Sequence, residues 1–242
     1  TILRGCACEP EVGWLCSYLN GMGAKIFFPE KDIICIEGVK RLRPGDGVIP
    51  PDRIVAGTYL LAAAATRGEI IIENPPLGEM DGILEVYRKM GGQYDILGGK
   101  LIVNGKNTGS PLKLLETEVY PGFPTDLQSP AMAVLATMPG ESRIREQVFE
   151  DRFGTAAALR KMGADITCKG KDAWVRGVYP LKGARVKALD LRGGAALAVA
   201  ALGAEGKTVI EDCSHIVRGY EDICRDINAL GGKISWMESD TG

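Results

Sequence analysis

Residues 51–68 read PDRIVAGTYLLAAAATRG, in which an aspartate precedes a run of apolar residues that ends before a glycine. The segment 54–66 has no polar face, and a helix that is apolar on nearly every side must be surrounded by protein. The segments 127–138 and 191–204 repeat this pattern, each with an aspartate just before it. The sequence therefore predicts three buried helices in equivalent places.

A second, amphipathic helix in each unit ends in Met-Gly or Leu-Gly, where glycine supplies the left-handed residue that often closes a helix. These pairs recur roughly 70 residues apart, a spacing typical of internal repeats, at residues 22–23, 90–91, 162–163 and 230–231. Two short strands are predicted after each of the first three pairs, at 25–28 and 33–36, 93–96 and 101–103, and 166–168 and 173–175. After the fourth pair only one strand is expected, at 233–237.

The repeated unit is thus a buried helix, a strand, an amphipathic helix and two strands, with another strand entering it. The strands after the buried helices are predicted at 70–73, 143–147 and 208–211. This pattern predicts an α/β fold with apolar helices at the centre and sheets outside. Residues 1–47 contain only an amphipathic helix, at 10–22, and its hairpin, so they are expected to end an earlier unit, with the PGDG turn at 44–47 as the boundary.

The composition excludes several classes of protein. A net charge of −2 over 242 residues leaves no basic excess for a dedicated nucleic-acid binder. No run reaches eighteen apolar residues, and we expect neither a membrane span nor a secretory signal. Seven cysteines without a C-x-x-C pair, and a single histidine, predict a reduced cytoplasmic chain without a metal site. The sequence contains no strand–G-x-G-x-x-G–helix fingerprint of the kind that would indicate a dinucleotide cofactor.

Three equivalent helices are expected to point the same way, which brings their partly positive N-termini together. Arg53 and Arg192 lie in first turns, and Arg218 is predicted to open the last amphipathic helix. Such a cluster suits an anionic ligand that carries phosphate or carboxylate. The alternative, which the residues leave open, is that these arginines merely pair with the aspartates nearby.

Asp52, Asp126 and Asp190 precede the three buried helices. For Asp52 and Asp190 the favoured role is an N-cap, which stabilises a helix by about 1 kcal/mol. Asp126 differs because it follows PGFPT at 121–125, where two prolines fix the path of the loop and hold the carboxylate rigidly. For this residue capping and general-base catalysis are equally supported.

Several of these stretches resemble signatures of the UDP-N-acetylglucosamine 1-carboxyvinyltransferases. The shared motifs separate the chain from the related 5-enolpyruvylshikimate-3-phosphate synthases, which have the same fold but other loops. The resemblance covers nearly the whole chain. Its motifs are PGFPTD at 121–126, VFEDRF at 148–153, DLR at 190–192, RGYE at 218–221, PDRI at 51–54 with GT at 57–58, and EPEV at 9–12.

The resemblance implies an inside-out α/β barrel of repeated units, in which the helices lie inside the sheets. Residues 1–48 would be the C-terminal remnant of a first barrel domain. Residues 49–242 would form a nearly complete second domain with repeats at about 49–117, 118–186 and 187–242. In the family an N-terminal segment completes that second domain, which would account for the single strand expected at the end.

The resemblance also implies an activity without a cofactor: transfer of the enolpyruvyl group of phosphoenolpyruvate to the 3-hydroxyl of UDP-N-acetylglucosamine, with release of phosphate, at the start of peptidoglycan precursor synthesis. Asp126 would be the general base, and Arg218 would act with it in catalysis. The backbone of Val148 would contact the UDP-sugar. The expected substrate-binding residues, with Arg53 added from its position, are Asp126, Val148, Asp190, Arg192, Arg218 and Arg53.

The chain departs from the family in two respects. Asp151 stands where asparagine is usual, and the first half of the family's chain has no counterpart. That half carries a lysine–asparagine pair for phosphoenolpyruvate, a general-acid cysteine and most uridine contacts. We therefore expect a fragment or a processed chain that is inactive alone and has the missing half as its partner. Two alternatives stay open: a non-catalytic relative that binds a ligand or a partner protein, and transfer to a different acceptor.

Overall fold

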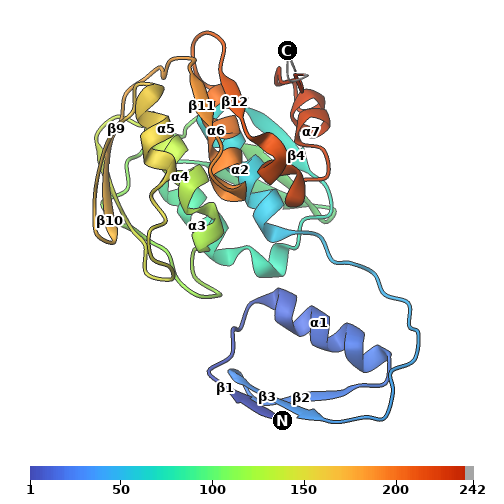
Figure 1. Ribbon diagram of the computed structural model, residues 1–242. Helices are drawn as coiled ribbons and strands as arrows, with labels where there is room; N and C mark the ends of the chain where they lie inside the picture. The colour runs from blue at the N-terminus through green and yellow to red at the C-terminus, as the bar shows by residue number, and fades with distance from the viewer. Residues whose placement is uncertain (238–242) are drawn as a thin grey trace, which may run out of the picture.

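The computed structural model describes residues 1–237 (Figure 1). The chain forms a small N-terminal part and a larger part that contains the repeats. In the small part, helix α1 (Pro10–Gly21) lies over an antiparallel sheet of order β1-β3-β2. The predicted helix is confirmed as α1, and the predicted hairpin is confirmed as β2 (Lys25–Glu30) and β3 (Ile33–Glu37). A strand that was not predicted, β1 (Ile2–Arg4), pairs with β3.

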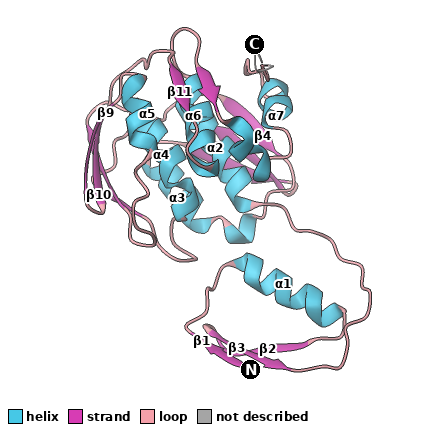
Figure 2. Ribbon diagram, in the orientation of Figure 1, coloured by secondary structure: helices cyan, strands magenta, loops and turns pink. Residues whose placement is uncertain are grey.

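Three buried helices form the centre of the larger part and pack against one another, as predicted (Figure 2). They are α2 (Arg53–Thr66), α4 (Gln128–Leu135) and α6 (Leu191–Leu202). Every residue of α4 is buried. A 3₁₀ turn, η2 (Thr125–Leu127), precedes α4, and Pro130 lies in the first helical turn, where a missing N–H costs no hydrogen bond.

The strands lie outside these helices in three sheets (Figure 2). An entering strand was expected in each unit, and the second and third units have one, since β7 pairs in parallel with β8 and β11 with β12. In the first unit the described residues place no strand on the free edge of β4. The first sheet has the order β4 (Glu69–Ile72), β6 (Lys100–Asn104), β5 (Gln93–Leu97). The second sheet has the order β7 (Leu115–Glu116), β8 (Glu141–Arg145), β10 (Asp172–Arg176), β9 (Asp165–Lys169). The third sheet pairs β11 (Arg185–Lys187) with β12 (Val209–Glu211).

The amphipathic helices cover the core with one face each and end as the repeat predicts. They are α3 (Asp81–Lys89), α5 (Thr155–Lys161) and α7 (Ile223–Ala229). Met90 and Met162, which close two of them, are fully buried. The glycine after each repeat position has a φ between 89° and 95°, a conformation that glycine adopts without steric cost. These are Gly23, Gly91, Gly163 and Gly231.

The predicted strand at 233–237 is wrong, because this segment is irregular. Its start resembles that of β2. The Asn228 amide donates to the carbonyl of Ile234 and its oxygen accepts from the Ile234 N–H, and Asn20 binds Ile26 in the same way. The segment after Ile26 continues as a strand because β3 pairs with it, whereas the described residues place no strand beside 233–237. A strand needs such a partner for its backbone groups.

Among the described helices, none combines the length and the apolar composition that crossing a membrane requires.

Candidate functional site

The N-terminal ends of the buried helices meet at one end of the larger part, as predicted. Arg192, in the first turn of α6, donates from Nη2 to Asp126 Oδ2 over 2.8 Å, which joins α6 to the turn before α4. The hydroxyls of Thr58 on α2 and Tyr220 lie 2.8 Å apart. Helix α2 also contacts η2 directly. These contacts bring together the PDRI, PGFPTD, DLR and RGYE motifs.

Asp52 and Asp190 are N-caps. Asp52 Oδ1 accepts from the N–H groups of Ile54 and Val55 at 2.6 and 3.1 Å, and Asp190 Oδ1 accepts from Gly193 N at 2.7 Å. The favoured interpretation of these two aspartates is therefore confirmed. Their carboxylates occupy N–H groups at the starts of α2 and α6 that an anion would otherwise bind.

Asp126 has a different role in the structure, because its side chain caps no helix. Its Oδ2 accepts from Arg192, and its Oδ1 lies 3.7 Å from Nη1 of Arg152. The side chain is 34% exposed. A guanidinium group on each side thus orients a carboxylate that solvent and a ligand can reach. The pairing of an arginine with an aspartate, which the sequence left open, is confirmed for Arg192.

Arg192 has hydrogen-bonding capacity to spare. Its Nη1 is buried and lacks a partner within residues 1–237, although its Nη2 binds Asp126. Tyr220 lies close by, and burial raises the pKa of its phenol while the positive charge of Arg192 partly offsets that effect. A buried donor left unpaired is costly, so an acceptor placed beside Arg192 would be stabilised.

Arg53 is 6% exposed and points toward the small N-terminal part. It donates from Nε to Glu11 Oε1 over 2.9 Å and from Nη2 to Oε2 over 3.4 Å, and its guanidinium lies 5.5 Å from the centre of the Tyr120 ring. The arginine is therefore paired with a glutamate of α1 rather than with one of the three aspartates. This bidentate pair links the two parts of the chain.

Arg218 does not open a helix, and that prediction is wrong. It ends a 3₁₀ helix, η3 (Cys213–Arg218), and α7 begins only at Ile223. The reason is local, because Asp222 caps α7 by accepting from Arg225 N at 2.9 Å. Arg218 is exposed, and within the described residues no hydrogen bond or ion pair holds its guanidinium.

The Val148 loop follows β8, and its backbone is bound by the side chain of Glu146. The N–H groups of Val148 and Phe149 both donate to Glu146 Oε1, at 2.9 and 3.1 Å. The backbone N–H of Val148 is therefore occupied, which leaves its carbonyl for a ligand. Sequence reasoning missed Glu146. Its signal is the alternation along β8 and just beyond, where Ser142, Ile144 and Glu146 all point inward.

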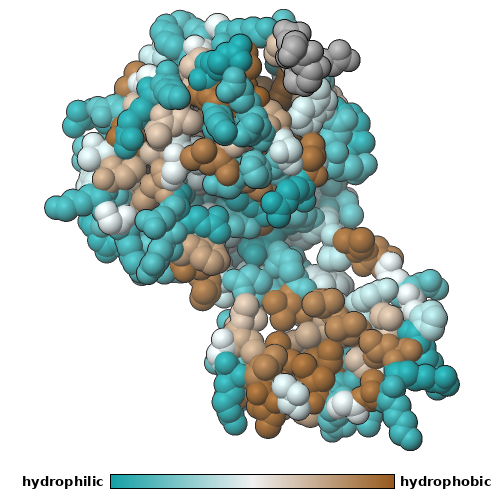
Figure 3. All heavy atoms as spheres, viewed as in Figure 1, coloured by the Kyte–Doolittle hydropathy of each residue, from teal (hydrophilic) through white to brown (hydrophobic). Residues whose placement is uncertain are grey.

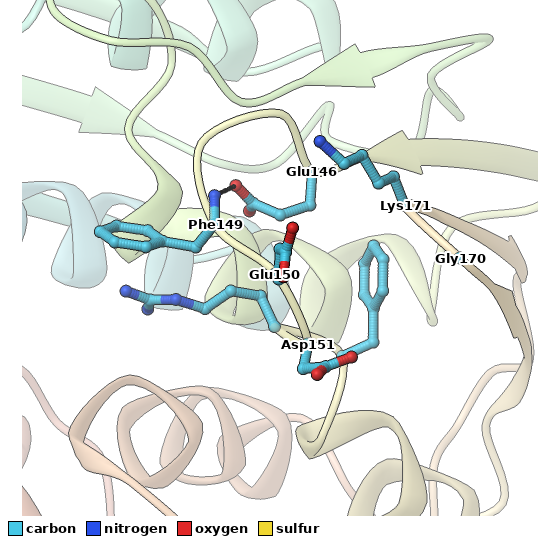
Figure 4. A pocket seen from close by; sticks show the side chains of 8 residues that line it. Glu146, Phe149, Glu150, Asp151, Gly170 and Lys171 are labelled. Carbon is cyan, nitrogen blue, oxygen red and sulfur yellow. Dashed lines mark hydrogen bonds between the residues drawn. The ribbon is translucent and has the colours of Figure 1, made fainter.

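A cavity of about 250 Å³ lies beneath this loop (Figure 4). Figure 4 shows the Glu146 carboxylate directed at the Phe149 backbone. Asp151 has a φ of 53°, in the left-handed region that asparagine and aspartate tolerate best after glycine. This conformation suits the short polar side chain of Asp151. The cavity is lined by Glu146, Phe149, Glu150, Asp151, Arg152, Phe153, Gly170 and Lys171.

Within residues 1–237, no three His, Cys, Asp or Glu side chains come together in an arrangement that suits a metal ion.

The model of one family, EPSP synthase (3-phosphoshikimate 1-carboxyvinyltransferase), matches residues 1–227. The chain belongs to this family of enolpyruvyl transferases. Among curated relatives, UDP-N-acetylglucosamine 1-carboxyvinyltransferase 2 of Carboxydothermus hydrogenoformans is 44% identical over 236 residues. The protein of that name from Caldanaerobacter subterraneus subsp. tengcongensis is 41% identical over 234 residues. Each alignment covers 97% of this chain and 56% of the relative, so the chain spans little more than half their length.

Solved structures agree with the enolpyruvyl transferase fold. The enolpyruvyl transferase NikO from Streptomyces tendae has a TM-score of 0.85 at 26% identity, over 96% of this chain and 56% of that one. An EPSP synthase from Acinetobacter baumannii has a TM-score of 0.64 at 19% identity, over 90% of this chain and 54% of that one. The predicted α/β fold with helices inside the sheets is therefore confirmed, as is the resemblance to the C-terminal portion of the UDP-N-acetylglucosamine enzymes.

Proposed function

We propose that this chain is the C-terminal portion of an enzyme that transfers the enolpyruvyl group of phosphoenolpyruvate to the 3-hydroxyl of UDP-N-acetylglucosamine and releases phosphate. The observation that carries the proposal is the Asp126 carboxylate, accessible and oriented by Arg192 and Arg152 where the buried helices begin. The names of the curated relatives support this choice of substrates. The product would enter peptidoglycan precursor synthesis in the cytoplasm.

In this proposal the hydroxyl oxygen of the sugar attacks phosphoenolpyruvate, and Asp126 accepts the proton of that hydroxyl. Accepting this proton is the task of a positioned general base. Arg192 and Arg218 balance the negative charge of the substrate carboxylate and of the departing phosphate. The arginines must supply most of this stabilisation, because Asp52 and Asp190 already cap α2 and α6. Val148 would hold the UDP-sugar through its carbonyl.

Arg53 would contribute to the site only indirectly. Its guanidinium is already bound by Glu11 and packed against Tyr120, so a direct substrate contact would require this bidentate pair to open. The pair instead fixes the position of α1 beside the start of α2. A role in aligning the two domains therefore suits Arg53 better than the ligand contact expected from its sequence position.

The small N-terminal part has an apolar face that suits a covering domain (Figure 3). We assign residues 1–48 to the end of a first barrel domain and 49–242 to the second. The part of the relatives that this chain does not span would complete the first domain and cover this face. The exposed side chains include Trp14, Leu15, Tyr18, Phe27 and Phe28, each between 45% and 57% exposed. The chain alone would lack half of the cleft and would be inactive.

The experiment is phosphate release by the protein that contains this chain together with the remaining domain. Release from phosphoenolpyruvate should require UDP-N-acetylglucosamine, and the chain by itself should release none. Competition with other UDP-sugars tests the acceptor, since indifference to the uridine moiety would indicate a different one. A protein that binds the UDP-sugar without any turnover would instead be a non-catalytic relative, and the proposal would fail.

A further inference from the structure

We propose that Glu146 is a positioning residue, whose single buried carboxylate holds the Asp126 loop and the Val148 loop in one arrangement. The catalytic part of this inference rests on the proposed function, whereas its structural part does not. Glu146 is 1% exposed and lies beneath the Val148 loop rather than in the open site, so it acts on substrates only through the residues that it holds.

The carboxylate accepts from four donors on three segments of the chain. Oε1 accepts from the Thr117 hydroxyl at 2.8 Å and from the N–H groups of Val148 and Phe149. Oε2 accepts from the Thr125 hydroxyl at 2.9 Å. Thr125 is the neighbour of Asp126, and Thr117 follows β7. Both oxygens are thus used, and each is directed at a different predicted substrate-binding loop.

The charge of Glu146 makes these bonds strong. Within residues 1–237 it forms no ion pair, and although Lys171 lines the same cavity, the bond between them is from the Glu146 backbone N–H to the Lys171 carbonyl. A buried carboxylate without a cation must be stabilised by its hydrogen bonds. Hydrogen bonds to a charged acceptor are stronger than those between neutral groups. Releasing either loop would therefore leave a buried charge short of donors.

Thr117 reinforces the arrangement, because its hydroxyl oxygen also accepts from Gln147 N at 2.9 Å. The side of the Val148 loop nearest β8 is therefore bound by both Glu146 and Thr117. Within residues 1–237, the Asp126 loop is bound to the Glu146 carboxylate by a single hydrogen bond, from the Thr125 hydroxyl. Removing the Thr125 hydroxyl should consequently loosen Asp126 and leave the Val148 loop in place, whereas neutralising Glu146 should affect both loops.

Two variants test these consequences separately in the protein that contains the full-length chain. Glu146→Gln keeps the shape but makes the acceptor neutral, and Thr125→Val removes only the hydroxyl beside Asp126. Thr108→Val is the matched control, because Thr108 is 4% exposed and its hydroxyl donates to the carbonyls of Ala64 and Gly105, away from the loop. All three proteins should give the same far-ultraviolet circular dichroism.

Hydrogen–deuterium exchange tests the structural part. In Glu146→Gln the amides of Val148 and Phe149 should exchange at least about tenfold faster, because a neutral acceptor holds them less strongly. In Thr108→Val and Thr125→Val they should exchange as in the wild type. Unchanged exchange in Glu146→Gln would overturn the inference whether or not the protein is an enzyme.

Steady-state kinetics test the catalytic part. Thr125→Val should lower kcat at least about tenfold with little change in the KM for the UDP-sugar, since a small misplacement of a catalytic group is costly. Glu146→Gln should raise that KM as well as lower kcat. Equal kcat and KM in Thr125→Val and wild type would overturn the positioning role. A wild type without turnover would instead contradict the proposed function, and exchange would still decide the role of Glu146.

Discussion

Asp52, Asp126 and Asp190 stand at equivalent places before the three buried helices, yet their carboxylates bind different groups. Two accept backbone N–H groups, and the third accepts from an arginine side chain. The difference follows from the segment before each helix, since Asp126 lies within a 3₁₀ turn and its side chain caps neither that turn nor α4. One residue type at one repeat position thus supports two tasks.

Asp151 allows a prediction at the same scale. Because its φ of 53° lies in the left-handed region, Asp151→Asn should keep the free energy of unfolding within about 0.5 kcal/mol of the wild type. Asp151→Val should lower it by about 1–2 kcal/mol, since a side chain with a Cβ branch is strained there. Urea denaturation of the two variants measures the difference. Equal stabilities would mean that the loop relaxes to another backbone conformation.

At the scale of elements, α2 packs closely against η2, the turn that precedes α4, at a position where α2 has a glycine. A Cβ added at Gly57 of α2 would lie 2.4 Å from Cδ1 of Leu127, which is fully buried. Gly57→Ala should therefore lower the free energy of unfolding by about 1–3 kcal/mol. Gly13→Ala on α1 is the control, because nothing lies within 4 Å of its added Cβ and alanine favours helix there. Thermal melts that shift equally for both variants would contradict this account of the packing.

The sheet of the second unit contains a pH-sensitive ion pair. Hydrogen bonds from Arg143 and Arg145 lower the pKa of Asp172 to about 2, below its usual value of about 3.9. A depressed pKa contributes stability that is present above pH about 4 and lost as the pH falls toward 2. Asp172→Asn should remove this part of the acid dependence between pH 4 and 2. An unchanged acid dependence in that window would show that the pair contributes nothing.

The sequence predicted these elements better than it predicted the contacts between them. Apolar periodicity and the repeated Met-Gly pairs identified the helices of the core, because the buried positions of a helix are occupied mainly by apolar residues. The prediction of a final strand at 233–237 failed because a strand must pair with a second strand, and the local sequence pattern does not show whether one is present. Glu146 and Arg152 were missed as site residues for a related reason, since a glutamate or arginine in a loop is usually exposed. Asp126 was selected as a candidate because two prolines mark its loop and because the PGFPTD stretch resembles a family motif.

At the scale of the whole molecule, two side-chain hydrogen-bonded pairs among residues 1–237 join the small N-terminal part to the rest. Arg53 binds Glu11, and Trp14 Nε1 donates to Glu79 Oε1 over 2.9 Å. These polar contacts leave several large apolar side chains of the small part exposed (Figure 3). The proposed arrangement, in which a further domain covers them, places the site between two domains, with Asp126 and its arginines on the side that this chain provides.

The most direct test is the steady-state rate of phosphate release by the protein that includes the remaining domain, with Asp126→Asn beside the wild type. If Asp126 is the general base, kcat should fall at least about 100-fold while the KM for the UDP-sugar changes little. Asp172→Asn, which removes a carboxylate from the sheet of the second unit, should keep the wild-type kcat. Wild-type turnover in Asp126→Asn would contradict the account.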